Sequence, residues 1–256
     1  MPFATNPADE VGIHYELHGS GPAMLLHHGG GSSLERWHDF GYVQALSRNF
    51  LLVLVDARGH GKSDRPDCPE AYRYERWVTD LVAVLDDAGI KRAHFFGYSL
   101  GGLIGFRIPQ YAPQRFDSLI LGGAHPYAQY DFFNQQYENF KDGLDGYLKM
   151  RERQGNPVSE PERTRLEDAH LDVYANVGLA LRDEPGAIEH LRINTLPMLL
   201  FIGEDDATDG SNEKLPAAAV DIANSTLLTV PGFGHSDLVR RPDLILPCVL
   251  AFIGSL

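Results

Sequence analysis

The stretch Ala93-His94-Phe95-Phe96-Gly97-Tyr98-Ser99-Leu100-Gly101-Gly102 decides the fold of this chain. Its first residues form a short apolar run of strand length, and apolar side chains continue at helical spacing from Leu103 to Ile108. The glycines on both sides of Ser99 allow a turn so tight that the serine hydroxyl stands exposed. The order of strand, tight turn and helix therefore predicts Ser99 as a nucleophile.

Short apolar segments recur along the rest of the chain and predict further strands. They are Val11 to Leu17 in alternation, and the runs 23–28, 50–55, 116–121, 196–202 and 226–230. Helical spacing or composition marks the stretches 72–88, 217–223 and 243–253. Strands that alternate with helices in this way predict the α/β class, with a mostly parallel sheet flanked by helices on both faces.

One long segment interrupts this alternation. No buried strand is visible from His125 to His190, and the segment is rich in aromatic side chains, namely Tyr127, Tyr130, Phe132, Phe133, Tyr137, Phe140, Tyr147 and Tyr174. We interpret residues 125–190 as a helical cap inserted into a core domain made of residues 1–124 and 191–256. Such an insertion begins after one sheet strand and ends before the next, as a lid does.

A serine nucleophile needs a base, and the base needs an acid to orient it. His235 is the last histidine of the chain and stands in a glycine-rich turn directly after a predicted strand, so we expect it to be the base. The acid should come from Glu204, Asp205 or Asp206, which follow another strand. From the residues alone the choice among these stays open, with Asp209 as a more distant candidate.

The negative charge that develops on an attacked carbonyl oxygen needs fixed N–H donors. His28-Gly29-Gly30-Gly31 follows a predicted strand, and its glycines let the backbone approach a substrate closely. The residue after the nucleophile, Leu100, supplies a second backbone donor at the start of a helix. These two segments predict an oxyanion hole.

Taken together, five motifs resemble those of the α/β-hydrolase superfamily. They are the H-G-G-G turn at His28, D-x-R-G-x-G-x-S at Asp56 to Ser63, G-Y-S-L-G-G at Gly97, G-E-D-D at Gly203, and G-F-G-H ending at His235. The resemblance implies the α/β-hydrolase fold, Asp206 in preference to Asp205 as the acid, and Gly30 as the first oxyanion donor. It also implies that Asp56, Arg58 and Ser63 hold a turn by hydrogen bonds and take no part in chemistry.

Within that superfamily the chain resembles small capped esterases, lactonases and carbon–carbon bond hydrolases. The resemblance implies a serine hydrolase that cleaves a carboxylic ester or lactone of a small, partly apolar substrate through an acyl-enzyme. Two alternatives stay open, a carbon–carbon hydrolase of a diketone and a ligand-binding receptor with a vestigial triad. Ser236 follows the histidine where the carbon–carbon hydrolases usually carry tryptophan, and this weakens that alternative.

Aromatic side chains near the first loop, the nucleophile and the cap suggest where an apolar substrate would lie. We expect Trp37, Tyr98, Tyr127, Tyr130 and Phe133 to contact it. The chemistry needs no cofactor and no metal.

Composition limits the partners that we expect. A net charge of −13 argues against nucleic acid and anionic membranes, and two cysteines are too few for a disulfide scaffold. Residues 1–10 contain no Lys or Arg and no apolar core, so we expect no signal peptide and a cytoplasmic location. A small-molecule substrate is the expected partner, and a homodimer stays open.

Overall fold

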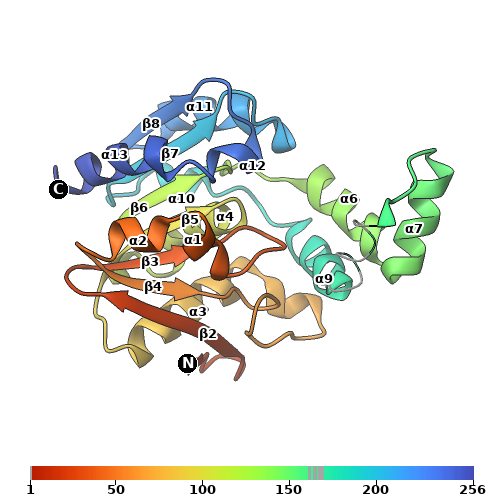
Figure 1. Ribbon diagram of the computed structural model, residues 1–256, viewed down its shortest axis with the longest axis horizontal. Helices are drawn as coiled ribbons and strands as arrows, with labels where there is room; N and C mark the ends of the chain where they lie inside the picture. The colour runs from red at the N-terminus through yellow and green to blue at the C-terminus, as the bar shows by residue number, and fades with distance from the viewer. Residues whose placement is uncertain (1, 161–162, 164–165, 167–169) are drawn as a thin grey trace.

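The computed structural model, which describes residues 2–160, 163, 166 and 170–256, has an eight-stranded sheet at its centre (Figure 1). The strands are β1 (Phe3–Thr5), β2 (Gly12–Gly19), β3 (Ala23–His27), β4 (Leu51–Val55), β5 (Ala93–Tyr98), β6 (Phe116–Gly122), β7 (Met198–Gly203) and β8 (Ser225–Val230). Their order across the sheet is β1-β2-β4-β3-β5-β6-β7-β8. Strand β2 is antiparallel to both of its neighbours, and the strands from β4 to β8 are parallel.

The inner strands are apolar on both faces because both faces are covered. In β3, Leu25 packs into one hydrophobic cluster while Met24 and Leu26 pack into a second cluster on the other face. All three side chains are fully buried. The predicted α/β class with a mostly parallel sheet is confirmed. Strand β1 escaped prediction because three residues are too few to carry a periodic signal.

Helices cover both faces of the sheet. They are α1 (Glu35–Asp39), α2 (Tyr42–Leu46), α3 (Tyr74–Asp87), α4 (Leu100–Gly105), α5 (Ile108–Tyr111), α6 (Tyr130–Phe140), α7 (Gly143–Arg153), α9 (Leu171–Leu181), α10 (Ile188–Arg192), α11 (Ser211–Asp221), α12 (His235–Leu238) and α13 (Pro242–Ile253). Side chains of α3, such as Trp77, join the first cluster, and those of α2 and α13, such as Tyr42 and Ile245, join the second. No helix in the described parts of the chain is long and apolar enough to cross a membrane.

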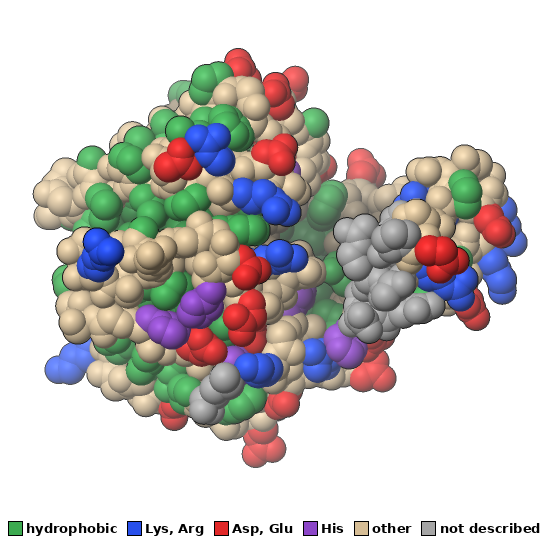
Figure 2. Space-filling view, viewed as in Figure 1, with side chains coloured by type: hydrophobic (Ala, Val, Ile, Leu, Met, Phe, Trp, Pro, Cys, Tyr) green, Lys and Arg blue, Asp and Glu red, His purple; other side chains and the backbone are tan. Residues whose placement is uncertain are grey.

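Helices α6, α7 and α9 form a cap that stands out from the sheet and its covering helices (Figures 1 and 2). The segments that lead into and out of this cap are joined, because the N–H of Ala187 donates to the carbonyl of Pro126 at 2.6 Å. Helix α10, which begins within the last residues of the expected cap, packs with α5 and α11. Residues 161–162, 164–165 and 167–169 of the expected cap lie outside the described residues.

The chain order around β3 opens a crevice at one end of the sheet. Strand β4 pairs with one side of β3, and β5 pairs with its other side. The connections that leave the carboxyl ends of β3 and β5 therefore diverge, and in open α/β sheets ligands bind at such a point. The predicted oxyanion loop follows β3 and Ser99 follows β5, so topology alone brings the two together.

The backbones of these two connections touch directly. The N–H of Gly101 donates to the carbonyl of His28 at 3.2 Å. A Cβ atom on Gly101 would lie 2.3 Å from the carbonyl oxygen of His27, and one on Gly97 would lie 2.3 Å from that of Gly101. Both neighbours are backbone atoms that cannot turn away. Positions 97 and 101 therefore have room only for glycine.

We expect Gly101→Ala to lower the free energy of unfolding by about 1–3 kcal/mol or more, because overpacking against backbone forces the sheet edge to shift. Chemical denaturation would measure the loss. Gly30→Ala is the matched control, since a Cβ there meets nothing within 4 Å. Equal denaturation midpoints for the two variants would contradict this account of the turn.

Candidate active site

Ser99 sits at the point where β5 turns into α4, in a backbone conformation that residues other than glycine rarely adopt. Its φ and ψ angles are 56° and −112°. Two hydrogen bonds hold this conformation, because the N–H of Ser99 donates to Gly122 at 2.8 Å and its carbonyl accepts from Leu103 at 2.9 Å. Strained backbone of this kind persists only where the surroundings fix it, and it concentrates at functional sites.

The structure brings the three residues of the expected triad together. His235 Nε2 lies 2.9 Å from Ser99 Oγ, and His235 Nδ1 lies 2.8 Å from Asp206 Oδ2. Asp205 is exposed and does not reach the histidine, whereas Asp206 is buried. Asp209 binds His125 at 2.8 Å and Lys214 at 3.1 Å instead. Of the candidate acids, only Asp206 is positioned to orient His235.

The ionised state of the Asp206 carboxylate fixes the tautomer of His235. Burial alone would raise the pKa of Asp206, but hydrogen bonds from His235 and from the backbone of Thr208 outweigh burial and lower that pKa below its ordinary value. An ionised carboxylate only accepts hydrogen bonds, so the Nδ1 of His235 carries the proton that faces it. The Nε2 atom is then free to accept the hydroxyl proton of Ser99.

The expected oxyanion donors lie beside Ser99. Leu100 is the first residue of α4, so its N–H has no partner inside that helix. Gly30 lines the space in front of Ser99 on both sides. The loop that carries Gly30 is held by His28, whose Nδ1 lies 2.7 Å from the carbonyl of Gly29 while its Nε2 accepts from the N–H of Ala57 at 3.1 Å.

The D-x-R-G-x-G-x-S segment forms a buried polar network that ties the loops together, as the resemblance implied. Asp56 accepts hydrogen bonds from the N–H of Leu34 and from His14, both at 2.8 Å. The Ser63 hydroxyl donates to the carbonyl of Asp56 at 2.7 Å. Arg58 is fully buried and pairs with Asp80 at 2.6 Å. These residues line neither of the cavities next to Ser99.

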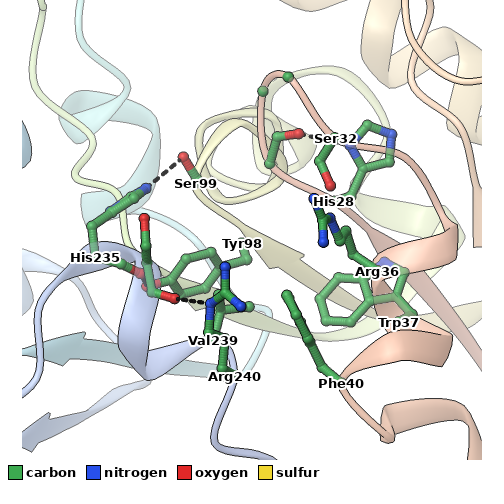
Figure 3. A pocket seen from close by; sticks show the side chains of 14 residues that line it. His28, Ser32, Arg36, Trp37, Phe40, Tyr98, Ser99, His235, Val239 and Arg240 are labelled. Atoms are coloured by element: carbon green, nitrogen blue, oxygen red, sulfur yellow. Dashed lines mark hydrogen bonds between the residues drawn. The ribbon is translucent and has the colours of Figure 1, made fainter. Parts of the chain in front are cut away.

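Two cavities meet at Ser99. The first, of about 180 Å³, lies between the core loops and is lined by His235, Trp37 and Phe40 among others (Figure 3). The second, of about 100 Å³, lies under the cap and is lined mostly by apolar side chains from α4, α6 and α9. We call them the loop cavity and the cap cavity. A substrate that reaches Ser99 therefore has room on two sides of the reacting atom.

The aromatic residues expected to contact substrate divide into two groups. Trp37 and Tyr98 line the loop cavity, and Phe133 lines the cap cavity. Tyr127 and Tyr130 line neither cavity; Tyr127 packs against the hydrophobic core and Tyr130 is half exposed. Tyr98 has a positioning contact as well, since its hydroxyl donates to the carbonyl of His235 at 2.5 Å.

Several polar residues at these cavities were not expected from sequence. Arg36 and Arg240 line the loop cavity, and Gln129, Gln136 and Asp209 line the cap cavity. No local motif marks them, because they reach the site from helices and loops whose direction only the fold decides. The side chain of Gln129 is hydrogen-bonded to His125. The interaction between Asp209 and His125 also holds that histidine in place.

Among the described residues, one group has the donor types and spacing of a metal site. It consists of Glu16, His18 and His38, whose ligand atoms all lie within 4.8 Å of one another. These residues come from β2 and α1 and line neither cavity. They are remote from the serine chemistry.

Comparisons with known proteins agree with this fold. A family model described as the alpha/beta hydrolase fold matches residues 22–148. The solved structure of a hydrolase from Pseudomonas aeruginosa PA01 is similar along 99% of this chain and 98% of its own, with a TM-score of 0.82 and 27% identity.

Two relatives match parts of the sequence. A protein provisionally named carbamate hydrolase RutD, from Stutzerimonas stutzeri, is 35% identical over 42% of this chain and 41% of its own length. The 3-oxoadipate enol-lactonase 2 of Acinetobacter baylyi is 32% identical over 46% of this chain and 43% of its own length. The matched part of the chain thus spans about two fifths of these relatives.

We expect the buried histidines beside the oxyanion loop to make the fold sensitive to acid. Burial lowers the pKa of His27 to about 4 and that of His28 well below its ordinary value. Between pH 6.5 and about 4 the unfolded chain therefore binds more protons than the folded one, and stability falls as the pH falls. Each such histidine contributes a slope of up to about 1.4 kcal/mol per pH unit.

Denaturation midpoints measured across this range would check the slope. His27→Asn keeps a side-chain N–H near the position of Nδ1 and removes the titration, so its stability should depend less steeply on pH than that of the native chain. An identical slope in both proteins would rule out His27 as a source of the acid sensitivity.

Proposed function

This chain belongs to the α/β-hydrolase superfamily, and from that premise we propose that it is a serine hydrolase that cleaves a carboxylic ester or lactone of a small, partly apolar substrate. The observation that carries the proposal is the pair of hydrogen bonds that link Ser99, His235 and Asp206 in series. A serine hydroxyl in contact with an oriented, neutral imidazole is an activated nucleophile.

In the first half of the reaction, Ser99 Oγ attacks the carbonyl carbon while its proton passes to His235 Nε2. The carbonyl electron pair moves to oxygen, and Asp206 stabilises the imidazolium that forms. When the tetrahedral intermediate collapses, the bond to the alkoxide oxygen breaks and His235 returns the proton to it. Water then attacks the acyl-enzyme by the same path and releases the acid.

The N–H groups of Gly30 and Leu100 bind the carbonyl oxygen as its charge develops. Both donors belong to backbone that is already fixed, so no reorganisation is needed during the reaction. The absence of a side chain at Gly30 keeps space for the substrate, since a Cβ there would contact none of the described residues within 4 Å. A glycine that the fold itself does not require supports a role in binding.

The character of the two cavities supports a substrate that is partly apolar. The cap cavity presents Leu103, Phe133 and Val177 with a few polar groups at one side. Apolar walls with a small number of placed polar groups are typical of small-molecule sites. The relative named 3-oxoadipate enol-lactonase 2 supports a lactone as one of the two proposed substrate types.

We expect Ser99→Ala to lower kcat/KM for p-nitrophenyl acetate and butyrate by several powers of ten, because the nucleophile is lost. A colorimetric assay of the native chain and the variant would measure it. Equal turnover by both proteins would exclude Ser99 as the nucleophile. Efficient cleavage of a vinylogous 1,5-diketone with little ester turnover would instead indicate a carbon–carbon hydrolase, and tight binding without turnover would indicate a receptor.

The adjacent aspartates offer a matched test of the acid. We expect Asp206→Asn to lower kcat by about 10³- to 10⁴-fold, because an amide no longer fixes the tautomer of His235. Asp205→Asn makes the same change one residue earlier, on an exposed side chain that does not touch the histidine, and should retain kcat. The reverse ranking would assign the role of acid to Asp205.

A further inference from the structure

Two arginine side chains line the loop cavity, and neither has a role in the mechanism proposed above. Arg36 comes from α1 and Arg240 follows α12, and both line the same cavity as Ser99. Figure 3 shows their side chains on opposite sides of the space in front of the nucleophile, with Phe40 between them. Both are exposed, so each guanidinium can meet a molecule that enters from solvent.

The two guanidinium groups contact the same aromatic ring, that of Phe40. The Cζ atom of Arg36 lies 5.8 Å from the centroid of Phe40, and the Cζ atom of Arg240 lies 5.2 Å from the same centroid. Both distances are within the range of a cation–π contact, which restricts a flexible side chain without using its N–H donors. Arg240 is oriented further by the bond from its Nε to the carbonyl of Ser236, at 3.1 Å.

The charge around these arginines is unusual for this chain. The sequence has 35 acidic and 22 basic residues, yet among the described residues that line the loop cavity there is no aspartate or glutamate. The nearest carboxylate to Arg36 is that of Asp39, 3.7 Å away within the same helix and itself exposed. In Figure 2 basic and acidic side chains lie next to one another on the visible face in the region of α1 and α12. The described residues that line the loop cavity itself include two arginines and no carboxylate, although the protein as a whole is acidic.

The position of His235 tells which part of the substrate occupies this cavity. As general acid, His235 delivers its proton to the leaving oxygen, so the leaving group must lie on the side of the histidine. His235 lines the loop cavity and does not line the cap cavity. The alcohol portion of an ester therefore points toward Arg36 and Arg240, and the acyl portion points under the cap.

We propose that the alcohol portion of the substrate carries an anionic oxygen group, a carboxylate or a phosphate, and that Arg36 and Arg240 bind it. This inference rests on the proposed ester hydrolysis and narrows its substrate class. The planar fork of a guanidinium matches the oxygens of either anion, and each of these two groups can bind such an anion by charge-assisted hydrogen bonds. In a lactone the same anion would sit on the ring fragment that becomes the alcohol.

Matched aryl acetates test the inference. The substrates are 4-acetoxybenzoate, its neutral methyl ester, and 4-acetoxyphenyl phosphate. We expect kcat/KM of the native chain to favour at least one anionic substrate over the neutral one. In the double variant Arg36→Gln/Arg240→Gln this preference should fall by about tenfold, mainly through KM, because the lost contacts are made before and during the reaction alike. A preference limited to one anion distinguishes a carboxylate subsite from a phosphate subsite.

Arg48→Gln is the control. Arg48 is exposed and lines neither cavity, so this substitution removes one positive charge away from the cavity, as each of the two arginine substitutions does within it, and should keep the preference. If the native chain and the double variant hydrolyse neutral and anionic esters in the same ratio, the anion subsite is refuted while the hydrolase function stands.

A binding measurement separates the two proposals if no ester is cleaved. In Ser99→Ala, calorimetric titration with 4-hydroxybenzoate and with phenyl phosphate reports the subsite without turnover. Binding of either anion that weakens about tenfold when Arg36 and Arg240 are also replaced supports the inference even without ester hydrolysis. Binding of neither, or equal binding with and without the arginines, overturns it.

Discussion

The close approach of two backbones at the carboxyl ends of β3 and β5 is the constraint on which the rest of this site depends. Gly101 donates to His28 across that contact, and neither Gly97 nor Gly101 has room for a side chain. This contact fixes the loop that begins at His28 relative to Ser99. It also keeps Ser99 in a conformation that an isolated chain would leave, so the reactive geometry is supported by packing in the sheet.

The surroundings of the titratable side chains near Ser99 set their charges. Asp206 is kept ionised by the hydrogen bonds that it accepts, and His27 and His28 are kept neutral by burial. His235 lies between the carboxylate of Asp206 and the hydroxyl of Ser99. A second carboxylate nearby, Asp209, is occupied by His125 and Lys214 and does not compete for His235.

The cap and the core loops give the two sides of Ser99 different characters. The cap cavity is mostly apolar, whereas the loop cavity has two arginines and no acidic residue among the described residues that line it. Ser99 lines both cavities, whereas His235 lines only the loop cavity. Under the proposed ester hydrolysis, such a site would treat the acyl and alcohol portions by different physical means, apolar contact on one side and charge on the other.

The sequence by itself determined the elements and the reactive residues whose signals are local. A glycine pattern that permits a tight turn, apolar runs of strand length and the order of Ser99 before His235 are all properties of short segments. The residues alone left Asp205 and Asp206 open and the family resemblance favoured Asp206. The tertiary structure shows that Asp206 is the one that reaches His235, because adjacent residues in the turn after a strand point in different directions. It also excluded Tyr127 and Tyr130 from the cavities and brought Arg36 beside Arg240. Those contacts join segments that are distant in sequence, and their geometry depends on how whole helices pack.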